Sequence, residues 1–210
     1  MILKYSIILF VFLYGSISVF AQRDDIVLTK EKKEYAFRSV KELKEGAIVV
    51  RLKTNQRKIQ LLEKTLKGTG LKKNQRKRHQ AMLDGTIRVR DAFNNAIADM
   101  FLDSFSFCAV YLMYDTSSNA LKKGQRKGMF LNEDKKTDPS IQLNESFVFL
   151  VNYKKSSGEF PFDVLRVQKL NERLEEPFPY FIQLRESWIN QINSPRAARA
   201  VVQLDRKLNN

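Results

Sequence analysis

Three short runs of β-branched and aromatic residues, set apart by longer segments with helical spacing, limit the folds open to this chain. The runs cover residues 47–52, 107–114 and 146–153. Each is bounded by polar or turn-forming residues, which is the pattern of a buried β-strand. Two weaker runs, 162–167 and 178–184, predict a fourth and a fifth strand.

The segments between these runs predict helices. An apolar stripe over residues 72–101 indicates one long helix, which Gly85 could bend or break. Thr54 is placed to cap a shorter helix before it, and 195–208 has the apolar spacing of a C-terminal helix. We therefore predict an α/β or α+β fold with a mixed sheet of about four to five strands covered by helices.

The first 21 residues have the layout of a secretory signal peptide. Lys4 precedes an apolar stretch that begins at Tyr5, and small residues at Val19 and Ala21 form a cleavage site before Gln22. The alternative is an N-terminal membrane anchor, because the apolar stretch approaches the length that crosses a bilayer. We expect cleavage after Ala21 and a secreted or periplasmic protein.

The mature chain is expected to contain one folded domain. Residues 22–45 form a polar N-terminal segment, and 46–210 has no linker-like stretch that would divide it. Hydrophobic residues make up 43% of the chain, which is enough for a packed core. We therefore expect a single α/β domain over 46–210.

Positive charge is concentrated in one part of the chain. The whole chain has 37 Lys and Arg against 23 Asp and Glu, a net charge of +14. Residues 30–78 alone hold 17 basic against 5 acidic side chains, whereas 79–210 is nearly balanced. The tripeptide Gln-Arg-Lys occurs three times, at 56–58, 75–77 and 125–127. Unequal spacing excludes a solenoid repeat and indicates a recurring surface element.

This basic segment predicts contact with an anionic partner. The stretch from Arg51 to Arg78 contains no aromatic residue, which argues against recognition of nucleic acid by base stacking. An anionic glycan, a lipid headgroup or an acidic protein surface fits better, and peripheral membrane contact is compatible with each. The expected contact residues are Lys53, Arg57, Lys58, Lys72, Lys73, Arg76, Lys77 and Arg78. A solvated, charge-dense surface without a ligand is the alternative.

Catalysis has few candidate residues. The chain has one His, His79, and one Cys, Cys108, which excludes a multi-histidine metal site and an intramolecular disulfide. Cys108 lies in an apolar run and is expected to be a small buried hydrophobe, although an exposed thiol could pair between chains. We expect no cofactor and no metal.

Asp115 is the one weak candidate for a catalytic residue. It follows an apolar strand and precedes a helix, and ligands of open α/β sheets collect at such strand ends. Residues 110–117 are similar to the first motif of haloacid-dehalogenase-type phosphatases, but Ser117 stands where that motif has its second aspartate. The first hypothesis is therefore a non-catalytic binding or envelope protein. The alternative is an exported hydrolase of a phosphorylated or sulfated substrate that uses Asp115.

Overall fold

The fold is known here from a computed structural model. It describes residues 29–155, 163–174, 176–179, 181–184 and 195–209, of which those from Glu31 onward belong to one compact unit. The predicted signal peptide over 1–21 lies outside the described residues.

One mixed sheet organises this unit. Its six strands are β1 (Ala47–Leu52), β2 (Ala109–Tyr114), β3 (Phe130–Leu131), β4 (Val148–Lys155), β5 (Asp163–Lys169) and β6 (Phe181–Leu184). The order across the sheet is β3-β2-β1-β4-β5-β6. β1 pairs in parallel with both β2 and β4, and the remaining neighbours are antiparallel. β1 is therefore a central strand with a parallel partner on each side.

Helices cover both faces of the sheet. They are α2 (Lys30–Lys44), α3 (Gln56–Lys67), α4 (Lys73–Ser104), α5 (Ser118–Lys122) and α6 (Pro195–Asn209), with a 3₁₀ turn, η1 (Asp115–Ser117), before α5. Residues Ile48 and Val50 of β1 face a core that includes Phe101 of α4 and Leu204 of α6. Val49, on the opposite face, belongs to a smaller core around α5. Burial of these apolar side chains is the main stabilising contribution.

The predicted architecture is confirmed: an α/β fold with a long helix and a C-terminal helix. The structure adds two elements. β3 is only two residues long, which is too short to produce a period-two pattern. α2 lies in the segment expected to be a polar N-terminal stretch, and only its buried positions Ala36, Ser39 and Leu43 mark its inner face.

Two local expectations are wrong. Gly85 neither ends nor breaks the long helix, because α4 continues through it from Lys73 to Ser104. Thr54 does not cap α3. The N-cap is Asn55, which has a left-handed backbone (φ 51°) and makes no side-chain cap bond. The Thr54 hydroxyl donates instead to Asp115 Oδ1 at 2.6 Å, so a tertiary contact has replaced the local one.

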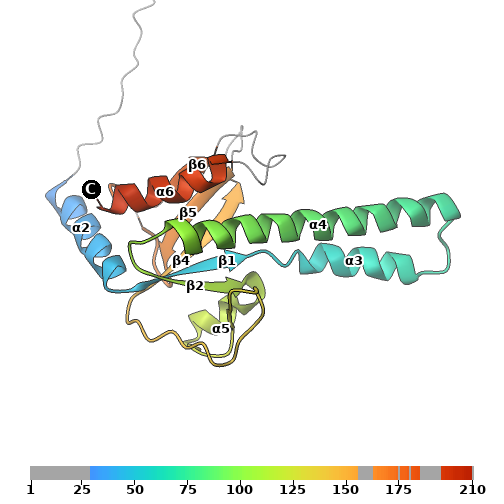
Figure 1. The fold of residues 1–210 in the computed structure, drawn as a ribbon, viewed down its shortest axis with the longest axis horizontal. Coiled ribbons are helices and arrows are strands. Elements are labelled where there is room, and N and C mark those ends of the chain that lie inside the picture. The colour runs from blue at the N-terminus through green and yellow to red at the C-terminus, as the bar shows by residue number, and fades with distance from the viewer. Residues whose placement is uncertain (1–28, 156–162, 175, 180, 185–194, 210) are drawn as a thin grey trace, which may run out of the picture. The chain divides into compact units, whose positions relative to one another are not determined.

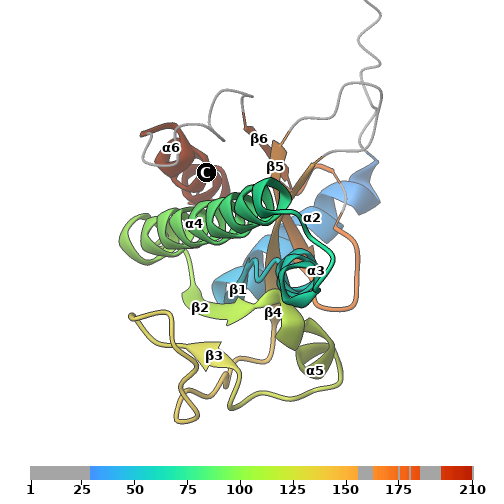
Figure 2. The same ribbon diagram turned by 90° about the vertical axis from the view of Figure 1, so that its right-hand side faces the viewer.

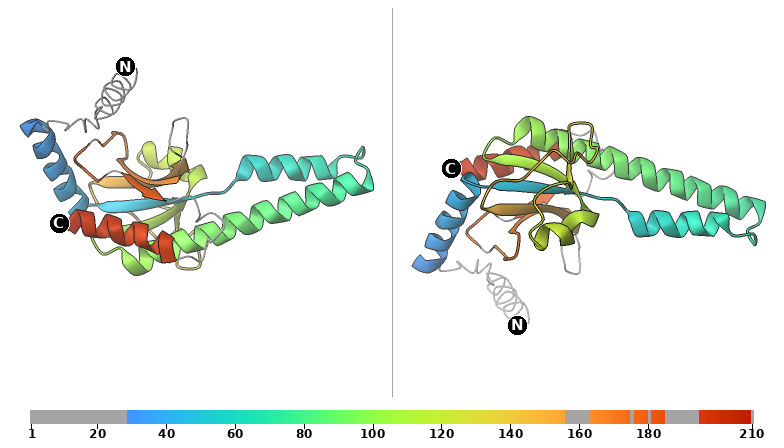
Figure 3. Two further views of the ribbon diagram at one scale, coloured as in Figure 1. Left: turned by 90° about the horizontal axis from the view of Figure 1, so that it is seen from above. Right: turned by 90° about the horizontal axis from the view of Figure 1, so that it is seen from below.

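α3 and α4 form an antiparallel hairpin that extends beyond the end of the sheet. β1 leads directly into α3, the chain turns at residues 68–72, and α4 returns to the sheet (Figure 1). Figure 2, seen towards the tip, shows the two helices side by side, and both views of Figure 3 show the hairpin projecting past the strands. The outer part of the hairpin is therefore not packed against the sheet.

A matched pair of glycine substitutions tests the packing. A Cβ at Gly46, which joins α2 to β1, would lie 2.3 Å from the Phe147 carbonyl oxygen, so the backbone would have to shift. We expect Gly46→Ala to lower the free energy of unfolding by about 2 kcal/mol or more. A Cβ at Gly85 would meet no atom within 4 Å, so Gly85→Ala should raise the free energy of unfolding by about 0.5–1 kcal/mol. Urea denaturation measures both, and equal effects would contradict the described packing.

Candidate functional site

The eight cations expected to form one anion-binding segment fall into two groups. Lys53, Arg57 and Lys58 lie at the base of the hairpin, where β1 ends and α3 begins. The other five lie at the tip, where α4 begins: Lys72, Lys73, Arg76, Lys77 and Arg78. A helix rises about 1.5 Å per residue, so the twelve residues of α3 place the groups roughly 18 Å apart.

The three Gln-Arg-Lys elements do not share one face. Residues 56–58 begin α3 and 75–77 begin α4, and because the two helices are antiparallel these elements stand at opposite ends of the hairpin. Residues 125–127 follow α5 and are not part of the hairpin. The repeat is therefore not a single binding surface.

Arg76 has a structural role at the tip. Its guanidinium donates to the backbone carbonyls of Leu66 and Gly68, at 2.5 and 3.0 Å. These carbonyls end α3, where the last turn has no partner within the helix. Arg76 thus closes the hairpin turn, and its lysine neighbours Lys72, Lys73 and Lys77 are exposed.

The base of the hairpin adjoins a polar crevice at the point where the parallel pairing of β1 with β4 ends. Two hollows of about 390 and 590 Å³ share Arg51, Asn55 and Asp115. The first is also lined by Lys53, Asn152, Tyr153 and Gln168. The second is also lined by Thr54, Gln56, Arg57, Lys58, Thr116, Ser118 and Asn119. Volumes of this size are typical of small-molecule sites.

Sheet topology explains the place of this crevice. From β1 the chain leaves through α3 and α4 to β2 on one side, whereas β4 on the other side continues to β5. Connections that depart in opposite directions leave a gap beyond the carboxyl ends of two adjacent strands. The parallel ladder of β1 and β4 ends at Val50 and Val151, and the polar residues Arg51 and Asn152 follow directly.

Arg51 is the residue that the sequence reasoning missed. Its position in β1 points to the same face as Ala47 and Val49, which belong to the core around α5. Arg51 Nη1 donates to Asn152 Oδ1 at 2.7 Å. The signal was present in the sequence: a single cation at an inward position of an apolar strand.

Asp115 lies at the strand end, as predicted, but one of its oxygens is occupied. Asp115 Oδ1 accepts hydrogen bonds from the Thr54 backbone N–H at 3.1 Å and from the Thr54 hydroxyl at 2.6 Å. Asn94 of α4 holds Lys53, the residue before Thr54. Its side chain accepts a hydrogen bond from the Lys53 backbone N–H at 2.9 Å and donates one to the Lys53 carbonyl at 2.8 Å. The loop that borders the crevice is therefore fixed from two sides.

Lys53 is only partly available to a ligand. Its ammonium lies 4.6 Å from the ring centroid of Phe93 and 5.4 Å from that of Tyr153. Cation–π contacts of this kind hold the side chain against the protein. Arg57 and Lys58 are exposed, and no ion pair to either is found within the described part of the chain.

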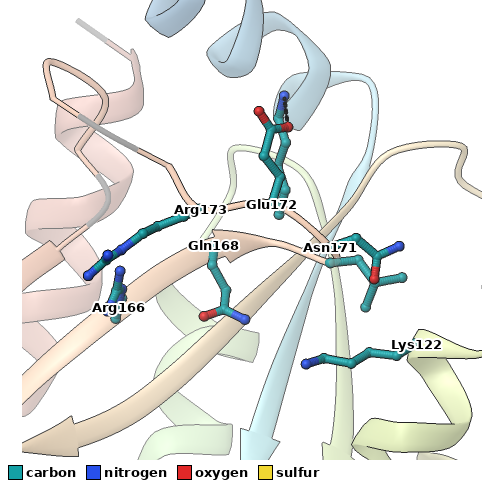
Figure 4. A pocket seen from close by; sticks show the side chains of 8 residues that line it. Lys122, Arg166, Gln168, Asn171, Glu172 and Arg173 are labelled. Carbon is teal, nitrogen blue, oxygen red and sulfur yellow. Dashed lines mark ion pairs between the residues drawn. The ribbon is translucent and has the colours of Figure 1, made fainter.

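A third hollow, of about 430 Å³, lies across β5. Lys122, Arg166, Gln168, Asn171, Glu172 and Arg173 are among the residues that line it (Figure 4). Its cation Lys169 contacts Glu42 at 2.7 Å and Glu172 at 3.3 Å. The Tyr35 hydroxyl donates to Glu172 at 2.8 Å and, together with Lys169, lowers the pKa of that carboxyl. This network ties α2 to β5, and its charges largely satisfy one another.

The described residues offer neither a metal-binding cluster nor a membrane-spanning helix. They contain no cluster of three or more His, Cys, Asp or Glu side chains arranged to hold a metal ion. In the same residues, no helix combines the length and apolar character needed to cross a bilayer. His79, the one imidazole, lies on α4, where its Nδ1 is 2.8 Å from the Gln75 carbonyl oxygen.

Comparison of the chain with models of known protein families, with curated proteins and with solved structures finds no match.

The hydrogen bonds of Asp115 predict a structural effect of its substitution. Asp115→Ala removes the acceptor for two donors of Thr54, and we expect the free energy of unfolding to fall by about 1–3 kcal/mol. Asp115→Asn keeps an acceptor oxygen and should cost less. Urea denaturation compares the two variants, and a fully stable Asp115→Ala protein would contradict this role.

The Cys108 thiol is predicted to be unreactive in the folded protein. Cys108 is half-buried rather than fully buried, and this partial burial raises the pKa of its thiol to about 12, so very little thiolate is present at pH 8. Relative to an ordinary thiol, the thiolate fraction is lower by roughly 1000-fold. We expect a disulfide reagent to label Cys108 far more slowly in the native protein than in guanidinium chloride. Similar rates in the two conditions would count against burial of the thiol.

Proposed function

We propose that this protein is an exported, non-catalytic binding protein that docks on an anionic surface through the α3–α4 hairpin. The observation that carries the proposal is the charge of the projecting element. Residues 56–90 contain 11 Lys and Arg and 2 acidic residues, a net charge of +9. A charge of one sign on a protruding element attracts an oppositely charged partner and orients the approach.

Exposed apolar side chains on the same hairpin favour a lipid surface over a glycan. Leu61 of α3 is 65% exposed, and Met82 and Val89 of α4 are 45% and 49% exposed. Met82 and Val89 are seven residues apart and therefore lie on one side of α4. Cations combined with apolar groups on a helix suit the interface of an anionic bilayer, where the apolar groups enter the headgroup region.

Hydrolysis of a phosphorylated or sulfated substrate by Asp115 remains the second candidate. The observation in its favour is that Asp115 lines the crevice at the carboxyl ends of the strands. The two hydrogen bonds from Thr54 to one carboxylate oxygen favour the structural role, and for this reason the docking function is placed first.

Matched lysine substitutions test the docking function. Lys72, Lys73 and Lys77 at the tip are replaced by Gln, and Arg76 is kept because it closes the turn. The control replaces Lys122 and Lys123, which precede the third Gln-Arg-Lys element, and Lys127, which ends it, so the charge change is identical. Near an anionic bilayer each lysine contributes about 1 kcal/mol.

Binding of the chain from Gln22 to Asn210 is measured by co-sedimentation with vesicles of phosphatidylglycerol and phosphatidylcholine, across a salt series. We expect the tip variant to bind roughly 100-fold more weakly and the control to bind nearly as well as the wild type. Tighter binding to heparin than to vesicles would assign the partner to anionic glycans. Binding that does not change with salt, or equal losses in both variants, would overturn the proposal.

A further inference from the structure

The crevice at the base of the hairpin has the properties of a second, separate binding site. It lies between the carboxyl ends of β1 and β2 and the middle of β4, and residues of these strands or of the turns after β1 and β2 line it. Tip residues 72–78 do not line it. It therefore differs from the docking surface in position and in shape, since it is a hollow rather than a projecting element.

Arg51 is the first indication of an anionic ligand. Its Nη1 is held by Asn152, while its Nε is buried and has no hydrogen-bond partner in the described residues. Arg51 makes no ion pair to a carboxylate within those residues. A partly buried guanidinium without a counter-ion is unfavourable, and an oxyanion in the adjacent hollow would supply the missing negative charge.

The charged residues around Arg51 also favour an anionic ligand. The larger hollow is lined by three cations, Arg51, Arg57 and Lys58, and by one carboxylate, Asp115. Two hydrogen bonds from Thr54 engage Oδ1 of that carboxylate. The lining therefore retains an excess of positive charge, and the exposed Arg57 and Lys58 can turn towards a ligand.

The smaller hollow indicates what the rest of the ligand contains. Beyond Arg51 it is lined by Lys53, Asp115 and Tyr153, and by three residues that carry side-chain amides, Asn55, Asn152 and Gln168. Amides both donate and accept hydrogen bonds, which suits the hydroxyl groups of a sugar-like molecule.

We propose that this crevice binds a hydroxyl-bearing phosphomonoester, with the phosphate group at Arg51, Arg57 and Lys58 and the hydroxyl groups at Asn152 and Gln168. The bordering loop is held by Asp115 and by Asn94, so the hollow is formed before a ligand arrives. This site is independent of the docking function. It also gives Asp115 a role in shaping a phosphate site that requires no chemistry at its carboxylate.

Isothermal titration with defined probes tests the site. The chain from Gln22 to Asn210 is titrated with inorganic phosphate, with glucose 6-phosphate and with glucose. We expect both phosphate-containing probes to bind, glucose 6-phosphate more tightly, and glucose not to bind. Amide chemical shifts in an NMR spectrum should change near Arg51, Asn55 and Thr116, and not near the tip.

Three variants make the test specific. Arg57→Gln with Lys58→Gln alters exposed positions that should not affect folding, and we expect it to weaken phosphate binding about tenfold or more. Arg51→Gln should have at least as large an effect, and its thermal unfolding is followed to confirm that it folds. Lys72→Gln with Lys73→Gln removes the same charge from the tip and should leave phosphate binding unchanged.

The outcomes separate this site from the docking function. The phosphomonoester site would be overturned if neither phosphate-containing probe binds. It would also be overturned if Lys72→Gln with Lys73→Gln weakens phosphate binding as much as Arg57→Gln with Lys58→Gln. If glucose 6-phosphate binds no more tightly than inorganic phosphate, the crevice does not bind the hydroxyl groups as proposed. If the variant with Lys72, Lys73 and Lys77 replaced by Gln loses vesicle binding but still binds phosphate, the result would support both sites independently.

Discussion

Parallel pairing of β1 with β2 on one side and β4 on the other organises the rest of this protein. The pairing brings the carboxyl ends of three strands to one edge of the sheet, and the segments that follow each strand must separate there. The segment after β1 becomes the helical hairpin, whereas the segment after β2 turns through η1 into α5 on the other face. A crevice between them is the geometric result.

Hydrogen bonds across this edge hold the arrangement. The loop between β1 and α3 is bound by Asn94 of α4 and by Asp115 of η1. Arg90 of α4 adds a longer bond to the Thr54 carbonyl at 3.4 Å. Since Asn94 is buried, its bonds to the Lys53 backbone are protected from water. The base of the hairpin is therefore rigid, and the tip is held mainly by the contact between α3 and α4.

Positive charge serves different purposes at different places on this chain. At the tip, Arg76 satisfies the carbonyls at the end of α3, and the neighbouring lysines are left exposed. In β1, Arg51 is fixed by Asn152 and borders a hollow. On β5, Lys169 is matched by Glu42 and Glu172. Only the first two arrangements leave positive charge for an external partner, and they differ in shape.

The sequence by itself determined β1, the position of β2 to within two residues, the long helix and the α/β class. These depend on apolar periodicity, which local residues express directly. It also located the basic segment and the position of Asp115 at a strand end. It did not separate the eight cations into base and tip, or assign Arg76 to the end of α3.

Only the tertiary structure decided these points. Contacts between residues distant along the chain replaced the local ones: Thr54 bonds to Asp115, 61 positions away, instead of capping α3. Arg51 bonds to Asn152, 101 positions away. Local spacing cannot encode such partners, because they are set by which strands pair and where the paired strands end.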